Sequence, residues 1–247
     1  MRQKVRKCLL IVSFLLFPIT IYYFSPALIM QAAAEHIING SFIVFVAMLV
    51  LSMFFGRAWC GYLCPAGGLQ ECAGMVKDKP AKQGWRDKIK FVIWIVWIGA
   101  VIATFVMGKG GVTIDPFFMT EHGISITEIY GYIIYYGIIL LLFTPAIIHG
   151  KRATCHYLCW MAPFMIIGGT IGRWLHLPQL HVEADKASCI GCGRCSKACP
   201  MGLDVKTMVE EGRNHKCSEC IQCGACIEEC PKKVLKYKLL WTKQEQK

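Results

Sequence analysis

Two stretches of twelve residues decide how the C-terminal part of the chain folds. Residues 189–200 read CIGCGRCSKACP and residues 220–231 read CIQCGACIEECP, so each is a copy of C-x2-C-x2-C-x3-C-P. Three thiolates at this spacing wrap one face of a cubane [4Fe-4S] cluster, while the fourth reaches the cluster of the other copy. The predicted ligands of the first cluster are Cys189, Cys192, Cys195 and Cys230, and those of the second are Cys199, Cys220, Cys223 and Cys226.

Other uses of these cysteines fit the spacing less well. A disulfide scaffold is disfavoured in a reducing cytoplasm, and zinc favours separated Cys pairs over a run of four. Cys217 lies three residues before Cys220 and could shift the second set, but only the set that ends at Cys230 keeps the three-residue gap and the proline. The segment resembles bacterial two-cluster ferredoxins over about 50 residues, which implies a compact, pseudo-symmetric βαβ pair.

The composition of the whole chain indicates that this segment is attached to an apolar part. The 247 residues include 15 Cys, and 27 Lys+Arg against 16 Asp+Glu give a formal charge of +11. They are 55% hydrophobic and only 17% charged, with a mean hydropathy of +0.45. An average soluble domain has about a quarter charged residues, so a simple cytosolic enzyme is excluded. The high apolar content also excludes a disordered chain.

Four charge-free runs account for the apolar content. They cover residues 8–30, 37–55, 91–108 and 129–148, each near the ~20 residues that span a membrane as a helix. Residues 153–172 are also free of charge, but Pro163 and the pair Gly168-Gly169 interrupt them, so we expect an interfacial or re-entrant segment rather than a fifth span. The sequence predicts an α-helical membrane domain with a four-helix bundle (1–178) and a cytoplasmic, ferredoxin-like α+β domain (179–247).

The basic residues predict the orientation of this bundle. Lys and Arg are enriched in cytoplasmic loops near helix ends. Four lie within residues 2–7, seven between residues 57 and 90, and two at residues 151–152, whereas Lys109 alone falls on the predicted outer side. Both termini are therefore expected in the cytoplasm of a bacterium or archaeon, with a multi-pass chain in its cytoplasmic membrane. Contact with anionic lipid explains the positive charge without a nucleic-acid partner.

A second cysteine motif occurs twice in the membrane part. Residues 57–65 read RAWCGYLCP, and residues 152–160 read RATCHYLCW. Cysteines at positions i and i+4 share one face of a helix, so each copy presents two sulfurs in one direction. Together, Cys60, Cys64, Cys155 and Cys159 could hold one additional metal centre or form two redox-active pairs. Duplication of a structural element with small, closely packed Cys is the alternative.

These features together resemble a known family. Membrane helices, two C-x3-C motifs and a two-cluster ferredoxin tail are similar to the quinol-dehydrogenase membrane components of periplasmic nitrate reduction and to the iron-sulfur half of the regulatory flavoprotein of nitrous-oxide reduction (the NapH/NosR type). The core of a cupric reductase linked to cytochrome oxidase assembly is also similar. Cys60, Cys64 and Pro65 match the family motif, whereas Trp160 replaces the proline of the second copy. The resemblance implies quinol oxidation and a partner oxidoreductase.

The sequence therefore predicts a membrane-bound electron-transfer protein that relays electrons through two [4Fe-4S] clusters between a quinol/quinone pool and a redox partner, either another oxidoreductase subunit or a soluble ferredoxin. The direction of flow and the catalytic residues stay open. The alternatives are a metal reductase or copper assembly factor that uses the repeated Cys pairs, and a non-catalytic ferredoxin anchor of a larger complex.

Polar residues that could serve a quinone site are few. Asp115, Glu121 and His122 fall in one predicted outer loop, and Glu35 and His36 fall in the other. Because loops are usually polar and lie at the surface, we favour ordinary hydrated residues there. On the inner side, His149 and His156 flank the second Cys pair as candidate ligands or proton carriers. Each is more simply explained by a structural hydrogen bond.

Overall fold

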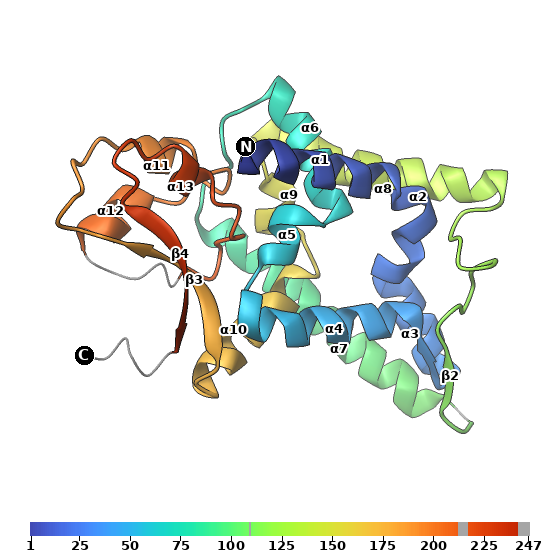
Figure 1. Ribbon diagram of the computed structural model, residues 1–247. Helices are drawn as coiled ribbons and strands as arrows, with labels where there is room; N and C mark the ends of the chain where they lie inside the picture. The colour runs from blue at the N-terminus through green and yellow to red at the C-terminus, as the bar shows by residue number, and fades with distance from the viewer. Residues whose placement is uncertain (109, 212–216, 242–247) are drawn as a thin grey trace.

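The computed structural model describes residues 1–108, 110–211 and 217–241 (Figure 1). Lys109, the basic residue expected on the outer side, lies outside the described residues. The elements of the helical part are α1 (Arg2–Leu15), α2 (Phe17–Thr20), η1 (Ile21–Phe24), α3 (Pro26–Ala34), β1 (Ile37–Asn39), α4 (Gly40–Phe55), α5 (Ala58–Tyr62), α6 (Pro65–Val76), η2 (Trp85–Lys88), α7 (Ile89–Met107), β2 (Thr113–Asp115), α8 (Ile129–His149), α9 (Ala153–Tyr157) and α10 (Ala162–Trp174).

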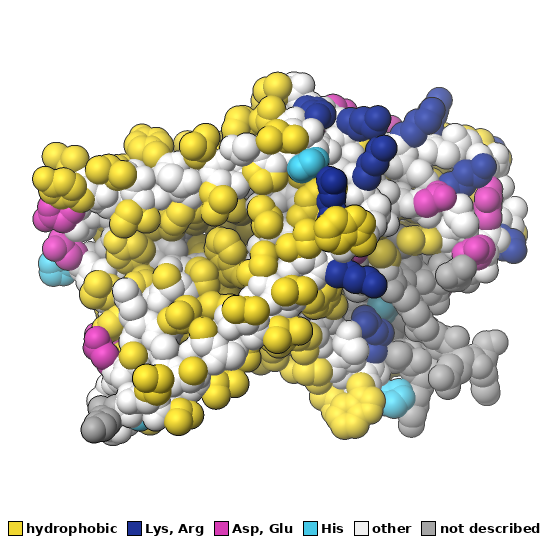
Figure 2. Space-filling view, turned by 180° about the vertical axis from the view of Figure 1, so that it is seen from behind, with side chains coloured by type: hydrophobic (Ala, Val, Ile, Leu, Met, Phe, Trp, Pro, Cys, Tyr) yellow, Lys and Arg dark blue, Asp and Glu magenta, His cyan; other side chains and the backbone are white. Residues whose placement is uncertain are grey.

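Two helices are long and apolar enough to cross a membrane. Helix α7 with η2 covers 23 residues and α8 covers 21, which meets the ~20 residues needed to span the hydrocarbon core. Their side chains face outward: Val96 is 67% exposed and Ile133 is 68% exposed. Figure 2 shows hydrophobic side chains across the surface of the helical part, with Lys and Arg gathered toward its boundary with the C-terminal part. These helices correspond to the predicted runs 91–108 and 129–148.

The other two predicted spans are interrupted. The run 8–30 is divided, because α1 and the helical segment 17–24 meet at a bend of 59°. Pro18 lies in the first turn of α2, where its missing N–H ends the hydrogen-bond ladder of α1. The run 37–55 begins as a strand, and Asn39 caps a helix of only 16 residues. Over the described residues, the structure therefore gives two candidate spans, or three if the bent pair is one span, where the sequence predicted four.

The segment 153–172 forms two helices rather than one broken span. Pro163 does not interrupt α10, because it occupies the first turn, where no backbone donor is needed. Gly168 lets α10 pack directly on α4: a Cβ at this position would collide with the Leu49 carbonyl and the Ser52 hydroxyl. At 13 residues, α10 is shorter than a membrane span.

The C-terminal part encloses both four-cysteine motifs between two strands. Strand β3 (Pro178–Ala184) pairs antiparallel with β4 (Leu235–Trp241). Three short helices lie between them: α11 (Arg194–Lys197), α12 (Val205–Glu210) and α13 (Ala225–Glu228). Helices α11 and α13 each start after a glycine in the left-handed region, Gly193 and Gly224, so the two motifs turn in the same way. One apolar core runs from Phe45 of the helical part to Ile221 of the C-terminal part.

Candidate metal centre and adjoining cavity

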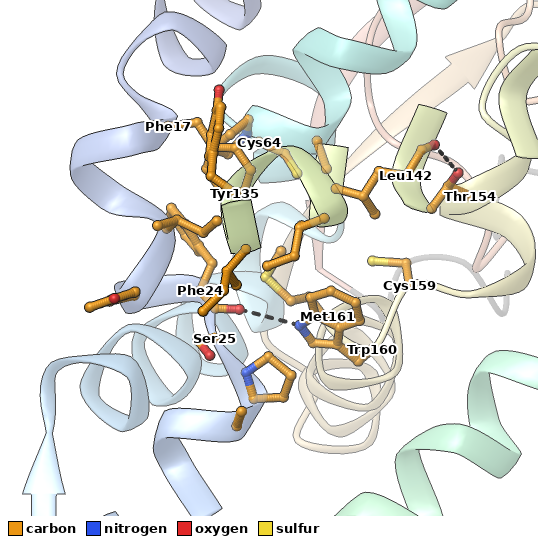
Figure 3. Close-up of a pocket in the computed structure, with 18 of the residues that line it drawn as sticks. Phe17, Phe24, Ser25, Cys64, Tyr135, Leu142, Thr154, Cys159, Trp160 and Met161 are labelled. Atoms are coloured by element: carbon orange, nitrogen blue, oxygen red, sulfur yellow. Dashed lines mark hydrogen bonds between the residues drawn. The ribbon is translucent and has the colours of Figure 1, made fainter. Parts of the chain in front are cut away.

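The repeated cysteine motifs converge on one cavity of about 230 Å³. Cys60 lies in α5 and Cys155 in α9, while Cys64 and Cys159 follow these short helices. The two copies share the same backbone turn, because Cys64 N donates to Trp59 O and Cys159 N to Thr154 O, both at 3.0 Å. Trp160 in place of proline therefore leaves the second turn intact. All four cysteines line the cavity, and Figure 3 shows Cys64 and Cys159 among the lining residues.

The rest of the cavity wall is apolar and aromatic. Figure 3 shows Phe17, Phe24 and Tyr135 along the wall opposite Cys159. The rings of Phe17 and Tyr135 lie 5.9 Å apart, and the indole of Trp160 donates to the Phe24 carbonyl at 3.4 Å. Phe17, Phe24 and Tyr135 come from α2, η1 and α8, so the cavity extends from the four sulfurs toward the apolar helices.

Burial disfavours free thiolates at this site. Cys60 and Cys64 are each 4% exposed and Cys155 is 6% exposed. Burial, followed by the nearby Cys155 and Cys60, raises the pKa of Cys159 to about 12, although Arg57 opposes the shift. The thiols are therefore neutral unless a cation holds them as thiolates. Within the described residues, no group of three or more His, Cys, Asp or Glu side chains is arranged to hold a single metal ion.

Each copy of the motif also buries an arginine that belongs to a triad of charges. In the first triad, Arg57 lies 2.8 Å and Lys90 lies 2.6 Å from the carboxylate of Glu219. In the second triad, Arg152 lies 2.8 Å and Arg6 lies 2.9 Å from the carboxylate of Glu71. We call these the Arg57 triad and the Arg152 triad. Each joins two cations to one carboxylate, and Asp87 also acts on Lys90 of the Arg57 triad.

The triads fit an anionic metal–thiolate centre. Arg57 Nε, Arg57 Nη2 and Arg152 Nε are buried without a hydrogen-bond partner among the described residues, and Arg152 Nη1 lies 4.0 Å from Cys155 Sγ. With neutral thiols, these guanidinium nitrogens stay buried beside the sulfurs without a partner, which is costly. Four thiolates on an oxidised [4Fe-4S] core carry a net charge of about −2, so the donor set and its surroundings match such a centre.

The C-terminal cysteines also gather in two sets of four. Cys189, Cys192, Cys195 and Cys230 line one hollow. In the second set, burial raises the pKa of Cys226 to about 12, and Cys223 and Cys199 add to the shift. The pKa of Cys220 is raised by burial first and then by Cys223, Cys226 and Cys199. The four cysteines of each set thus lie near one another, and their assignment as cluster ligands stays a prediction from the spacing.

The cavity adjoins the second of these sets. Gly61 follows Cys60, and a Cβ at this position would collide with the carbonyl of Ile221, which follows Cys220. In the other copy of the motif, the ring of His156 lies 3.1 Å from the carbonyl of Met201. Both motifs therefore touch a loop that carries a second-set cysteine. Cys192 of the first set, by contrast, is exposed at the surface.

Cys8, Cys72, Cys217 and the candidate residues His149 and His156 do not line the cavity. Cys8 is exposed, and Cys72 and Cys217 are partly buried without lining the cavity. His149 is exposed and packs its ring against Tyr157. His156 is fully buried, and its other ring nitrogen lies 3.2 Å from Asp87, so it bridges the two parts of the chain as a structural residue.

The outer-loop residues do not form a site. Asp115, Glu121 and His122 are exposed, and Glu35 is exposed as well. The ring nitrogens of His36 lie 2.9 Å from Phe105 O and 3.0 Å from Gly110 O. None of the five lines the cavity.

Sequence reasoning missed the carboxylates that complete the triads. Glu71 and Glu219 are distant in the chain from the arginines that they bind. One signal was present: Arg57 and Arg152 occupy the same position in both copies of the motif. Their partners, however, come from α6 and from the C-terminal part, and nothing in the local sequence specifies them.

Known sequence families match both parts of the chain. Residues 40–83 match a 4Fe-4S binding domain, and residues 181–231 match a 4Fe-4S dicluster domain. The first match contains Cys60 and Cys64, and the second contains the eight predicted ligands. The prediction of an iron–sulfur protein is thereby confirmed.

Several curated proteins are similar to the chain. It is 26% identical over 191 residues to YccM of Escherichia coli, a protein named for electron transport, covering 69% of this chain and 49% of that protein. It is 28% identical over 168 residues to the methylamine utilization ferredoxin-type protein MauN of Paracoccus denitrificans, covering 63% and 53%. The chain thus spans about half the length of these relatives. No solved structure matches it.

Proposed function

We propose that this chain is a membrane-bound electron-transfer protein of the quinol-dehydrogenase type that the sequence resembles. It relays electrons between a quinone in the cavity and a partner oxidoreductase. The iron–sulfur family matches support the redox chemistry, and the names of YccM and MauN support electron transport. We further propose that residues 1–178 lie in the cytoplasmic membrane and that residues 179–247, with both termini, lie on its cytoplasmic side.

The observation that carries this proposal is the contact between the cavity and the four repeated cysteines. A quinone ring is flat, apolar and lipid-soluble, and the cavity wall offers aromatic side chains such as Phe17, Phe24 and Tyr135. Pockets for small molecules are mostly apolar with a few polar groups. A ring bound there would lie beside Cys64 and Cys159, within reach of a redox centre.

The geometry also supports an order for electron transfer. We propose that Cys60, Cys64, Cys155 and Cys159 hold a third [4Fe-4S] centre, which when bound supplies one-electron chemistry next to the quinone. The close contact between Gly61 and the Ile221 carbonyl places this centre next to the second set of cysteines, so electrons would pass between these two. The first set reaches the surface at Cys192, where a partner could exchange electrons. This chain's side chains position the centres.

A cavity-filling variant tests the quinone site. Ile138 lines the cavity, whereas Ile133 on the same helix points outward and is 68% exposed. We expect Ile138→Trp to abolish cluster reduction by an added quinol, with dithionite reduction and iron content unchanged. The matched variant Ile133→Trp should behave like wild type. Equal quinol reduction in both variants would refute the assigned site, and no reduction of wild type by any quinol would refute the quinol-oxidising direction.

Metal analysis tests the third centre. Three [4Fe-4S] clusters correspond to about twelve iron atoms per chain, and two correspond to about eight. We expect anaerobically purified wild type to contain about twelve and a variant with Ser at positions 60, 64, 155 and 159 to contain about eight. Equal iron content in both proteins would contradict a third centre. Copper reduction that depends on these four cysteines would instead favour the metal-reductase alternative.

A further inference from the structure

We propose that the Arg57 and Arg152 triads set the reduction potential of the four-cysteine centre, and that the Arg57 triad alone links this centre electrostatically to the second cluster. This inference rests on the proposed function, because it takes the four cysteines to hold a redox centre. The triad residues are positioning residues, since they act through the thiolates and not on a substrate.

The first support is the repetition of a charged arrangement in a buried place. Arg57 and Arg152 stand three residues before the first Cys of each motif. Their side chains are 2% and 0% exposed, and each binds one carboxylate at 2.8 Å. A second cation completes each triad at 2.6–2.9 Å. The two motifs thus bring two buried guanidinium groups to the same group of sulfurs.

The sign of this charge predicts its effect on the centre. Reduction adds one negative charge to a cluster, and a nearby buried cation stabilises that charge more strongly than it would in water. Net charge and hydrogen bonds to the sulfurs are recognised determinants of cluster potential. Removing an arginine should therefore make the centre harder to reduce, whereas neutralising a triad carboxylate should make it easier to reduce.

The second support is the different origin of the two carboxylates. Glu71 belongs to α6, so the Arg152 triad lies wholly within the helical part. Glu219 directly precedes Cys220 in the C-terminal part, and Arg57 also donates to the Ser218 carbonyl at 3.5 Å. Among the described residues, the Arg57 triad thus directly contacts the loop that carries Cys220. The Arg152 triad reaches a second-set cysteine only through Gln3, which accepts from Arg6 at 2.7 Å and donates to the Cys223 carbonyl at 2.8 Å. The Arg152 triad therefore serves as the control for the effect of the Arg57 triad on the second cluster.

The experiment compares Arg57→Gln with Arg152→Gln in the full chain by anaerobic potentiometric titration followed by EPR. We expect both variants to lower the equilibrium constant for reduction of the four-cysteine centre at least tenfold, which is about 59 mV for a one-electron couple. Arg57→Gln should also shift the second cluster, whereas Arg152→Gln should leave it within twofold of wild type. Arg57→Lys should restore most of the shift, and the exposed Arg86→Gln should leave all potentials unchanged.

Carboxylate variants separate electrostatic tuning from simple structural damage. Glu219→Gln and Glu71→Gln each remove one negative charge, so we expect shifts to higher potential, opposite in sign to the arginine variants. Glu219→Gln, at a side chain that is 15% exposed, also keeps the test informative if an arginine variant does not fold. Shifts of the same sign in all variants, or none, would overturn the inference while leaving the third centre in place. A missing third EPR signal in wild type would instead contradict the proposed function.

Discussion

Replacing Glu71 by Gln should destabilise the folded chain more than any surface substitution. Glu71 is 5% exposed and is the shared carboxylate of Arg6 and Arg152, whose side chains are 3% and 0% exposed. The neutral amide of Gln keeps the shape of the side chain but leaves two buried guanidinium groups without a counter-charge. Removing one partner of a buried ion pair costs about 3–5 kcal/mol.

The titration of Glu71 gives an independent magnitude. Burial alone would raise the pKa of this carboxyl, but Arg152 and Arg6 lower it from 4.5 to about 2. That difference corresponds to about 3 kcal/mol in favour of the folded state when Glu71 is ionised. Because the folded pKa lies below the ordinary value, this stability is present above about pH 4.5 and is lost as the pH falls toward about 2.

Thermal unfolding of the anaerobically purified protein in detergent measures the effect. A loss of about 3 kcal/mol corresponds to a Tm lower by about 6–12 °C for a chain of this size. The exposed Glu121→Gln is the matched control and should change Tm by less than about 2 °C. A Glu71→Gln variant as stable as this control at pH 7 would refute the reasoning that the buried arginines depend on Glu71.

Four further outcomes are expected. Between pH 5 and 3, wild type should lose more stability than Glu71→Gln in the same unfolding assay, because the variant has no carboxyl to protonate there; parallel pH profiles would contradict this. Gly61→Ala should weaken the contact with the Ile221 carbonyl and speed proteolytic removal of the C-terminal part, whereas Gly99→Ala, with no neighbour within 4 Å of its added Cβ, should not. Cys217→Ser should keep the full iron content, whereas Cys220→Ser should lose about four iron atoms. An equal loss of iron in both variants would show that Cys217 is also a ligand of the second cluster. Asn39→Ala should cost about 1–2 kcal/mol in thermal unfolding, because Asn39 caps α4 and donates to the Leu28 carbonyl at 2.9 Å; an unchanged Tm would refute this cap.

The sequence predicted the helical class more accurately than the number of membrane spans. The runs 91–108 and 129–148 contain a single helix each. Apart from Pro145, they contain no proline that would remove a backbone donor, and no side chain within them caps a new helix. Pro145 lies inside α8 without ending it. Pro18 and Asn39, by contrast, divide the other two runs by local hydrogen bonding. Hydropathy measures apolar content and is insensitive to these breaks.

The spacing of the cysteines in the sequence was enough to predict an iron–sulfur protein. Only the tertiary structure decided which distant residues contact those cysteines and their neighbouring arginines. The C-x2-C-x2-C-x3-C-P motifs predict which cysteines bind each cluster because the geometry of a cubane constrains residues that are close in the chain. The repeated motif likewise marks Cys60 and Cys155 as equivalent. Only the folded chain brings both copies to one cavity and supplies Glu71 and Glu219 to their arginines. Each of these two ion pairs joins residues more than 80 positions apart in the chain. The packing of the helices buries the arginines, and a buried charge requires a partner of opposite charge.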